Sequence, residues 1–148
     1  MHPTAQRLSQ RLRARGLEVQ ITTLRDSART ASLAAAALGV QVGQIVKSLV
    51  FLRQQEPEVV LCAGDRRVDA ERLGLVPAPA QLVRTVTGFS IGGVPPLGHD
   101  TELPTTVDAS LRRFEVVWAA AGTHHDVFAV RTDALIEALG NPRVIDVS

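Results

Sequence analysis

Residues 45–52 read IVKSLVFL, and the expected fold class follows from this stretch. β-Branched and aromatic side chains fill it, and apolar residues occupy both of its alternating faces. A strand with two apolar faces is typical of the middle of a sheet that is covered on both sides. We therefore expect residues 45–52 to form a central strand, with Lys47 inside it.

A second apolar run, VVLCA at 59–63, follows after a polar turn and Pro57 and ends at Gly64-Asp65. The two runs together predict a β-hairpin. Other alternating or β-branched runs predict strands at 19–23, 115–119 and 126–130. Helical spacing of apolar residues and helix start and stop signals predict helices at 4–15, 31–38, 69–73, 79–86 and 133–139. The caps that we expect at helix starts are Thr4, Thr30, Asp69 and Thr132.

Residues 87–104 hold four glycines and three prolines in the sequence TGFSIGGVPPLGHDTELP. So many helix- and strand-breaking residues predict a shaped loop. The short strands and helices follow one another in irregular order, without the βαβ rhythm of a doubly wound sheet. We therefore expect one α+β domain with a mixed sheet, spanning residues 1–148 without an internal repeat or linker.

The composition is that of an ordinary folded globule, because 45% of the 148 residues are apolar and 21% are charged. The longest uncharged stretch, 30–46, is too short and too polar to span a membrane. Cys62 is the only cysteine, which excludes an internal disulfide and a thiolate zinc site. The N-terminus carries arginines without the apolar core of a secretory signal, so we expect a cytoplasmic protein, with an Arg-rich transit peptide as the minor alternative.

The formal net charge is only +1, from sixteen basic and fifteen acidic residues. This balance argues against a broad nucleic-acid-binding face and against DNA as a partner, and it leaves room for a small phosphate contact. The doublets Arg66-Arg67 and Arg112-Arg113 are candidates for that contact. Solvated surface charge is the more frequent explanation of such pairs.

Lys47 is the only lysine in the chain; the other fifteen basic residues are arginines. An ionised, unpaired lysine within a strand that is apolar on both faces costs several kcal/mol, so Lys47 must be neutral, paired or open to a cleft. A lysine at the strand edge, with its stem reaching to water, satisfies the same requirement. The sequence alone leaves both interpretations of Lys47 open, a lysine in a cleft and a lysine at the strand edge.

Other candidate chemistry has weaker support from the sequence. Gly88-Phe89-Ser90-Ile91-Gly92 matches the G-x-S-x-G pattern of serine hydrolases, but the glycines and prolines that follow exclude the helix that a nucleophile elbow requires. The histidines at 99, 124 and 125 lack metal-ligand spacing, so we expect neither a metal nor another cofactor. Cys62 lies mid-strand and is interpreted as an inert core thiol.

Four segments in this order carry a resemblance to a known family. They are TASLAAAALGVQVGQIVKSLVF at 30–51, LCAGDRRVD at 61–69, TGFSIGGVPPLGH at 87–99 and AAAG at 119–122. Together they resemble the YbaK/EbsC family of trans-editing aminoacyl-tRNA deacylases, which are free-standing relatives of the editing domain inserted in bacterial prolyl-tRNA synthetases. The resemblance covers nearly the whole chain. It implies a partly barrel-like mixed sheet surrounded by helices.

The resemblance also implies an activity, namely metal-free hydrolysis of the ester that joins a wrong amino acid to the 3′ end of a tRNA. Lys47 matches the essential lysine of the family, and Gly92 to Pro96 match its G-x-x-x-P loop. On this basis the expected substrate-binding residues are Ser48, Gly92, Gly93, Val94, Pro95, Pro96, Gly98, His99 and Gly122. The expected phosphate contacts are Arg66 and Arg67.

The resemblance leaves the edited amino acid open. Pro95, His99 and Ser48 are the positions that we expect to shape the choice, and a small aliphatic or hydroxyl side chain, carried by tRNA-Pro or a related tRNA, is the expectation. An aminoacyl-tRNA synthetase is a second candidate partner, and no membrane partner is expected. The alternative function is a module of the same fold that binds tRNA or a synthetase without catalysis.

Overall fold

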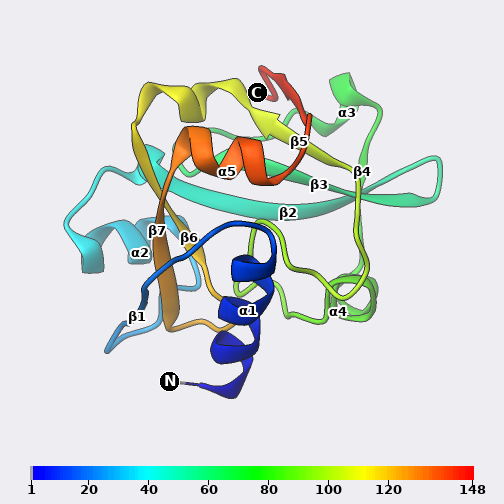
Figure 1. Ribbon diagram of the computed structural model, residues 1–148. Helices are drawn as coiled ribbons and strands as arrows, with labels where there is room; N and C mark the ends of the chain where they lie inside the picture. The colour runs from blue at the N-terminus through cyan, green and yellow to red at the C-terminus, as the bar shows by residue number, and fades with distance from the viewer. Residues whose placement is uncertain (1) are drawn as a thin grey trace.

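The computed structural model describes residues 2–148, and one mixed sheet organises them (Figure 1). Within these residues eight strands pair in the order β1-β7-β6-β2-β3-β5-β8, and β4 pairs with β2. The strands are β1 Ile21–Thr23, β2 Ile45–Arg53, β3 Glu56–Ala63, β4 Val76–Pro77, β5 Thr105–Asp108, β6 Val116–Ala120, β7 Asp126–Arg131 and β8 Arg143–Ile145. Parallel pairs (β2/β6, β3/β5, β5/β8) mix with antiparallel ones, which confirms the predicted mixed sheet.

Short helices surround this sheet. They are α1 Pro3–Ala14, α2 Ala31–Leu38, α3 Ala70–Leu73, α4 Ala80–Thr87 and α5 Thr132–Ala138, with two 3-10 turns, η1 Val42–Gln44 and η2 Ala109–Arg113. All five predicted helices are present, each within one residue of the expected bounds. Over residues 2–148, none of them combines the length and the apolar character that crossing a bilayer requires.

β2 is the central strand that its pattern predicts, with both faces packed. Val46 and Val50 lie in the main core, which α1, α4 and α5 cover. Leu49 and Phe51 pack on the opposite face, in a second cluster that includes Leu75. Fully burying an aliphatic or aromatic side chain contributes about 1.5–3 kcal/mol, so both faces hold β2 in place.

The predicted hairpin is confirmed, but β3 begins three residues earlier than expected, with Pro57 inside it. The antiparallel register places Lys47 opposite Cys62 and Leu52 opposite Pro57. The Gly64 N–H donates to the Ile45 carbonyl, so every second pair from there onward exchanges hydrogen bonds. The Leu52–Pro57 pair is one of the pairs that do not exchange hydrogen bonds. The missing N–H of Pro57 therefore removes no hydrogen bond between β2 and β3.

Two predicted helix caps are confirmed. The Thr30 hydroxyl accepts a hydrogen bond from the Leu33 N–H at 3.2 Å, and α2 ends at Gly39 with a φ of 68°. The Asp69 carboxylate accepts from the Arg72 N–H at 3.2 Å. Both satisfy backbone groups that a helix start leaves without a partner.

The other two predicted caps are wrong. α1 starts at Pro3, which needs no N–H partner at that position, and the Thr4 N–H donates to Nδ1 of His2. Thr132 is the first residue of α5, and its hydroxyl donates to the Phe114 carbonyl at 2.6 Å. That bond ties the start of α5 to the segment between η2 and β6 in place of capping the helix.

Candidate functional site

A gap along one edge of β2 opens into a cavity with a volume of about 710 Å³. β3 occupies one edge of β2 throughout, while the other edge pairs with β6 only at residues 45–46 and with β4 only at residues 51–52. Figure 1 shows β6 and β7 on the left side of β2, with α4 below the right half of the strand. Residues 47–50 therefore line an opening between β6 and β4.

The backbone of Ser48 faces this opening. Because the Ile45 carbonyl points toward β3, alternation along the strand turns the N–H and C=O of residues 46, 48 and 50 to the other edge. The hydrogen bond from the Ala78 N–H to the Val50 carbonyl lies on that edge, as this alternation requires. The side-chain hydroxyl of Ser48 is also buried, and it has no hydrogen-bond partner within residues 2–148. A bound water, an ion or a ligand group can supply the partner that such a hydroxyl lacks.

Lys47 lines the same cavity and is half-buried. Its Nζ donates to the backbone carbonyl of Arg66 at 2.5 Å. An ammonium carries three N–H groups, so this bond fixes its position and leaves two donors for other acceptors. The cleft-lysine interpretation is the one that this geometry supports.

Cys62 lies opposite Lys47 in the ladder and is fully buried. Burial raises the pKa of its thiol to about 11, although the nearby Lys47 ammonium lowers it in part. A thiol with such a pKa is protonated at neutral pH and is a poor nucleophile. The predicted inert core thiol is therefore consistent with its surroundings.

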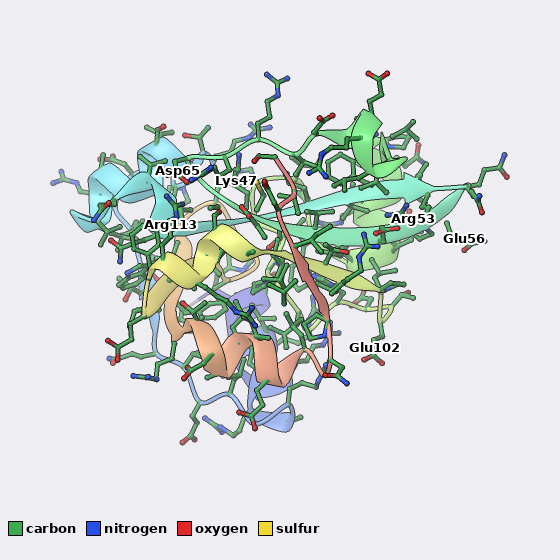
Figure 2. The ribbon with its side chains drawn as sticks, turned by 90° about the horizontal axis from the view of Figure 1, so that it is seen from above. Lys47, Arg53, Glu56, Asp65, Glu102 and Arg113 are labelled. Atoms are coloured by element: carbon green, nitrogen blue, oxygen red, sulfur yellow. The ribbon has the colours of Figure 1, made fainter. Side chains whose placement is uncertain are left out.

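The turn after β3 carries the carbonyl that holds Lys47. The Asp65 carboxylate in this turn pairs with Arg113 of η2 through two hydrogen bonds, of 2.7 and 2.9 Å. The Arg113 guanidinium holds the pKa of the Asp65 carboxyl below its ordinary value. In Figure 2, Lys47, Asp65 and Arg113 lie together at one end of the β2–β3 hairpin, whereas Arg53 and Glu56 lie at the other.

The predicted loop reaches the cavity through Ile91, Gly92 and Val94. The N–H of Gly93 donates to the Ser90 carbonyl, and prolines have no N–H, so the backbone donors that this loop can offer at the cavity wall belong to Ile91, Gly92 and Val94. Gly92 has a φ of 91°, and a Cβ there would lie 2.8 Å from Cγ of Arg29. Both facts require glycine at this position.

The remaining predicted loop residues lie outside the cavity wall. The His99 ring nitrogen Nε2 lies 2.7 Å from the Pro95 carbonyl, and burial lowers the pKa of His99. Gly93 and Gly122 pack so closely that a Cβ on Gly93 would be 3.0 Å from the Gly122 carbonyl oxygen. These contacts support the loop on the side away from the cavity. Direct roles in substrate binding stay predictions for Gly93, Pro95, Pro96, Gly98, His99 and Gly122.

The groups of a serine-hydrolase triad do not meet. Ser90 accepts a hydrogen bond from Arg84, and no helix begins after it within the described loop. The His124 ring contacts the Ile91 carbonyl, while Asp108 is bound to the Ala63 N–H. Among residues 2–148, no three His, Cys, Asp or Glu side chains gather as a metal site would need.

Two exposed arginines, from different segments of the chain, line the cavity wall. Arg67, from the predicted doublet, lines it beside Val68, whereas Arg66 lies outside the wall and approaches Asp65 at 3.9 Å. Arg29 lines it from the segment before α2. Sequence reasoning missed Arg29 because a single arginine before a helix has no distinguishing pattern. It also missed Trp118, which lines the cavity from β6.

Known proteins resemble this chain in sequence and in structure. A family model described as an aminoacyl-tRNA editing domain matches residues 25–138. The uncharacterized protein YwhH of Bacillus subtilis (strain 168) is 32% identical over 131 residues, which cover 81% of each chain. A crystal structure named as a candidate trans-editing enzyme for prolyl-tRNA synthetase superposes with a TM-score of 0.92 and 41% identity, covering 100% of this chain and 98% of the other.

A much longer protein shares the same segment. The proline–tRNA ligase of Nitratidesulfovibrio vulgaris (strain Hildenborough) is 30% identical over 132 residues, which make up 82% of this chain and 23% of the ligase. The similarity to the ligase therefore concerns a quarter of that enzyme.

Proposed function

Because this chain belongs to the aminoacyl-tRNA editing domain family, we propose that it hydrolyses the ester between a wrong amino acid and the 3′-terminal adenosine of a tRNA. The observation that carries the proposal is the shared cavity wall, in which Lys47 and the loop residues Gly92 and Val94 face one space. Its volume of about 710 Å³ suits a small-molecule moiety such as an aminoacylated terminal nucleoside. The editing unit of this proposal spans residues 1–148.

The chemistry asks for an oriented ester, an attacking water that a neighbouring ribose hydroxyl can help to orient, and donors for the developing oxyanion. Lys47 is the charged donor, since the Arg66 carbonyl takes only one of its three N–H groups. The N–H groups of Gly92 and Val94 are neutral donors on the other side of the cavity. These groups carry out the reaction without a metal or other cofactor.

The proposed amino acid is small. Alanine and valine side chains make up most of the apolar wall of the cavity, with Val46, Val50, Val83, Val94 and Ala119 among them. A largely apolar wall that also carries the hydroxyl-bearing residues Thr30, Ser48 and Thr123 suits an aliphatic or hydroxyl-bearing side chain. The acceptor end of tRNA-Pro, or of a related tRNA, is the proposed partner, and its phosphates approach Arg29 and Arg67 at the cavity wall. Delivery by a prolyl-tRNA synthetase is the proposed wider context.

The test is a panel of tRNAs charged with alanine, serine, threonine, cysteine or 2-aminobutyrate, incubated with the purified protein in EDTA. We expect at least one small amino acid to be released at a rate well above spontaneous hydrolysis. Correctly charged prolyl-tRNA is the matched control and should persist. Tight binding of every tRNA without release of any amino acid would favour the non-catalytic module and overturn the proposal.

A further inference from the structure

We propose that the ion pair between Asp65 and Arg113 is a positioning device for Lys47. The inference rests on the proposed function for its kinetic test, but it has a second test that needs no activity. It is carried by a chain of contacts that runs from η2 through the turn after β3 to the Lys47 ammonium.

The turn after β3 is the first link. Its Arg66 carbonyl accepts the Lys47 ammonium, so the position of this turn decides where the ammonium lies. The Arg66 N–H donates to the Ala63 carbonyl, and the Gly64 N–H donates to the Ile45 carbonyl. Gly64 also packs directly on η1, since a Cβ there would lie 2.3 Å from the Val42 carbonyl oxygen. The backbone of the turn is therefore held against the start of β2.

The ion pair is the second link. Arg113 binds both oxygens of Asp65 in the fork geometry that only a guanidinium offers, and its Nε donates to the Ser110 carbonyl at 2.7 Å. Both ends of Arg113 are thereby fixed to named groups, so it acts as a rigid strut between η2 and the turn.

Gly43 is the third link, because it brings the ion pair against the segment that leads into β2. A Cβ on Gly43 would lie 3.0 Å from Nη2 of Arg113 and 3.0 Å from Oδ2 of Asp65. Gly43 is buried beneath the pair, two residues before β2 begins. The pair thus joins three segments, η1, η2 and the turn, around the position of Lys47.

Of the groups in this chain of contacts, only the Lys47 ammonium is proposed to contact the substrate. Asp65 and Arg113 do not line the cavity, so they act through the Arg66 carbonyl and not on the substrate. Loss of the pair should let the turn and the ammonium move by a fraction of an ångström or more. Displacements of about 1 Å in a reacting group can lower rates by about a hundredfold.

The kinetic test compares Arg113→Ala, Arg113→Lys and Asp65→Asn with Arg131→Ala. Arg131 forms a similar exposed pair with Glu115 at 2.8 Å, away from the turn, so it is the matched control. We expect Arg113→Ala and Asp65→Asn to lower kcat by about tenfold to a hundredfold, with KM nearly unchanged. Arg113→Lys should recover part of the rate, because it keeps the charge without the fork. Arg131→Ala should match the wild type.

A labelling test follows Lys47 itself, which is the only lysine. An amine-acylating reagent should modify Lys47 severalfold faster in Arg113→Ala than in the wild type, with the N-terminal amine as internal reference and peptide mass spectrometry as the readout. Gly43→Ala, which keeps both charges and pushes the ends of the two side chains by a few tenths of an ångström, should give a smaller change in the same direction. Circular dichroism checks that each variant is folded.

The two failures are distinguishable. If the wild type deacylates nothing, the proposed function fails while the labelling rates still test the positioning of Lys47. If Lys47 is acylated at the wild-type rate in folded Arg113→Ala and Gly43→Ala proteins, the positioning inference is overturned, whatever happens to kcat.

Discussion

Lys47 combines two features that rarely occur together, a place in a central strand and an ammonium held at a cavity wall. The Arg66 carbonyl stabilises the charge, which answers how a cation is tolerated between two apolar clusters. The same bond orients the two remaining N–H groups. A residue in this position is expected to affect rate more than stability.

Replacing Lys47 tests that expectation. Lys47→Ala should lower the single-turnover deacylation rate by about a hundredfold to a thousandfold, the usual cost of removing one oxyanion donor. Lys47→Arg should stay well below the wild-type rate, because a planar guanidinium cannot place one point charge where the ammonium lies. Thermal unfolding of the same variants is the control. A fully active Lys47→Ala protein with a changed melting temperature would show a structural lysine instead.

His99 gives the protein a pH dependence of stability. Burial lowers its pKa below the ordinary value of 6.5, while the Pro95 carbonyl and Asp100 oppose this effect. The unfolded chain therefore binds the proton first as the pH falls through 6.5, and the free energy of unfolding decreases from there toward the lowered pKa of the folded state. Above pH 7 both states carry a neutral imidazole, so the contribution is constant.

Urea unfolding at several pH values between 8 and 5 measures this effect. His99→Gln keeps an N–H for the Pro95 carbonyl but does not titrate, so its stability should fall less over this range. The histidines at 2, 124 and 125 are common to both proteins and cancel in the comparison. Parallel stability profiles for the two proteins would contradict the assignment to His99.

The β2–β3 turn is a strained element that offers a stabilising change. Gln54 and Gln55 both adopt positive φ, of 48° and 71°, as a two-residue type I′ turn requires. Such angles are costly for residues with a Cβ. The double substitution Gln54→Asn and Gln55→Gly should raise the free energy of unfolding by about 1 kcal/mol, read from urea unfolding.

The kinetics of the same variant supply its control. The turn lies at the end of the hairpin opposite Lys47, so the deacylation rate should not change (Figure 2). A less stable double variant would mean that the glutamine side chains contribute more than the backbone strain costs.

The elements that sequence predicts best are those whose pattern matches their environment. The 45–52 run has two apolar faces because two clusters cover it, and Thr30 and Asp69 carry cap signals that the helices use. The missed strands are short, and their partners are distant. β5 and β8 have four and three residues and pair with each other, so neither shows a period of its own.

The candidate site likewise contains residues with a local sequence signal and residues without one. Of the residues at the cavity wall, Lys47, Gly92 and Val94 could be predicted, because a charge in an apolar strand and a cluster of glycines are visible locally. Arg29, Trp118 and the Asp65–Arg113 pair could not, since each depends on segments that only the folded chain brings together. His99 shows a further limit: the sequence marks it as polar and near the loop, but burial behind the loop is a tertiary property.

At the scale of the whole molecule, eight of the fifteen arginines lie within 4 Å of a carboxylate oxygen. Arg11, Arg53, Arg113 and Arg131 each pair with a carboxylate at 2.7 to 2.8 Å, which fits a net charge of only +1. The cavity wall, in contrast, presents Arg29 and Arg67 from two sides. Electrostatic attraction to tRNA is therefore expected to be local.

This distribution predicts a shallow salt dependence of tRNA binding. Neutralising about two to four single-strand phosphates, at about −0.7 each, gives a slope of log K against log salt of roughly −1.5 to −3. Arg29→Ala and Arg67→Ala should each reduce its magnitude by about 0.7. Arg66→Ala should change it less, because Arg66 lies outside the cavity wall and is drawn toward Asp65. Arg7→Ala, which removes the same charge from the exposed side of α1, is the matched control and should leave the slope unchanged. A steep slope, or equal effects of all four substitutions, would mean that tRNA contacts a broad surface and not the acceptor end alone.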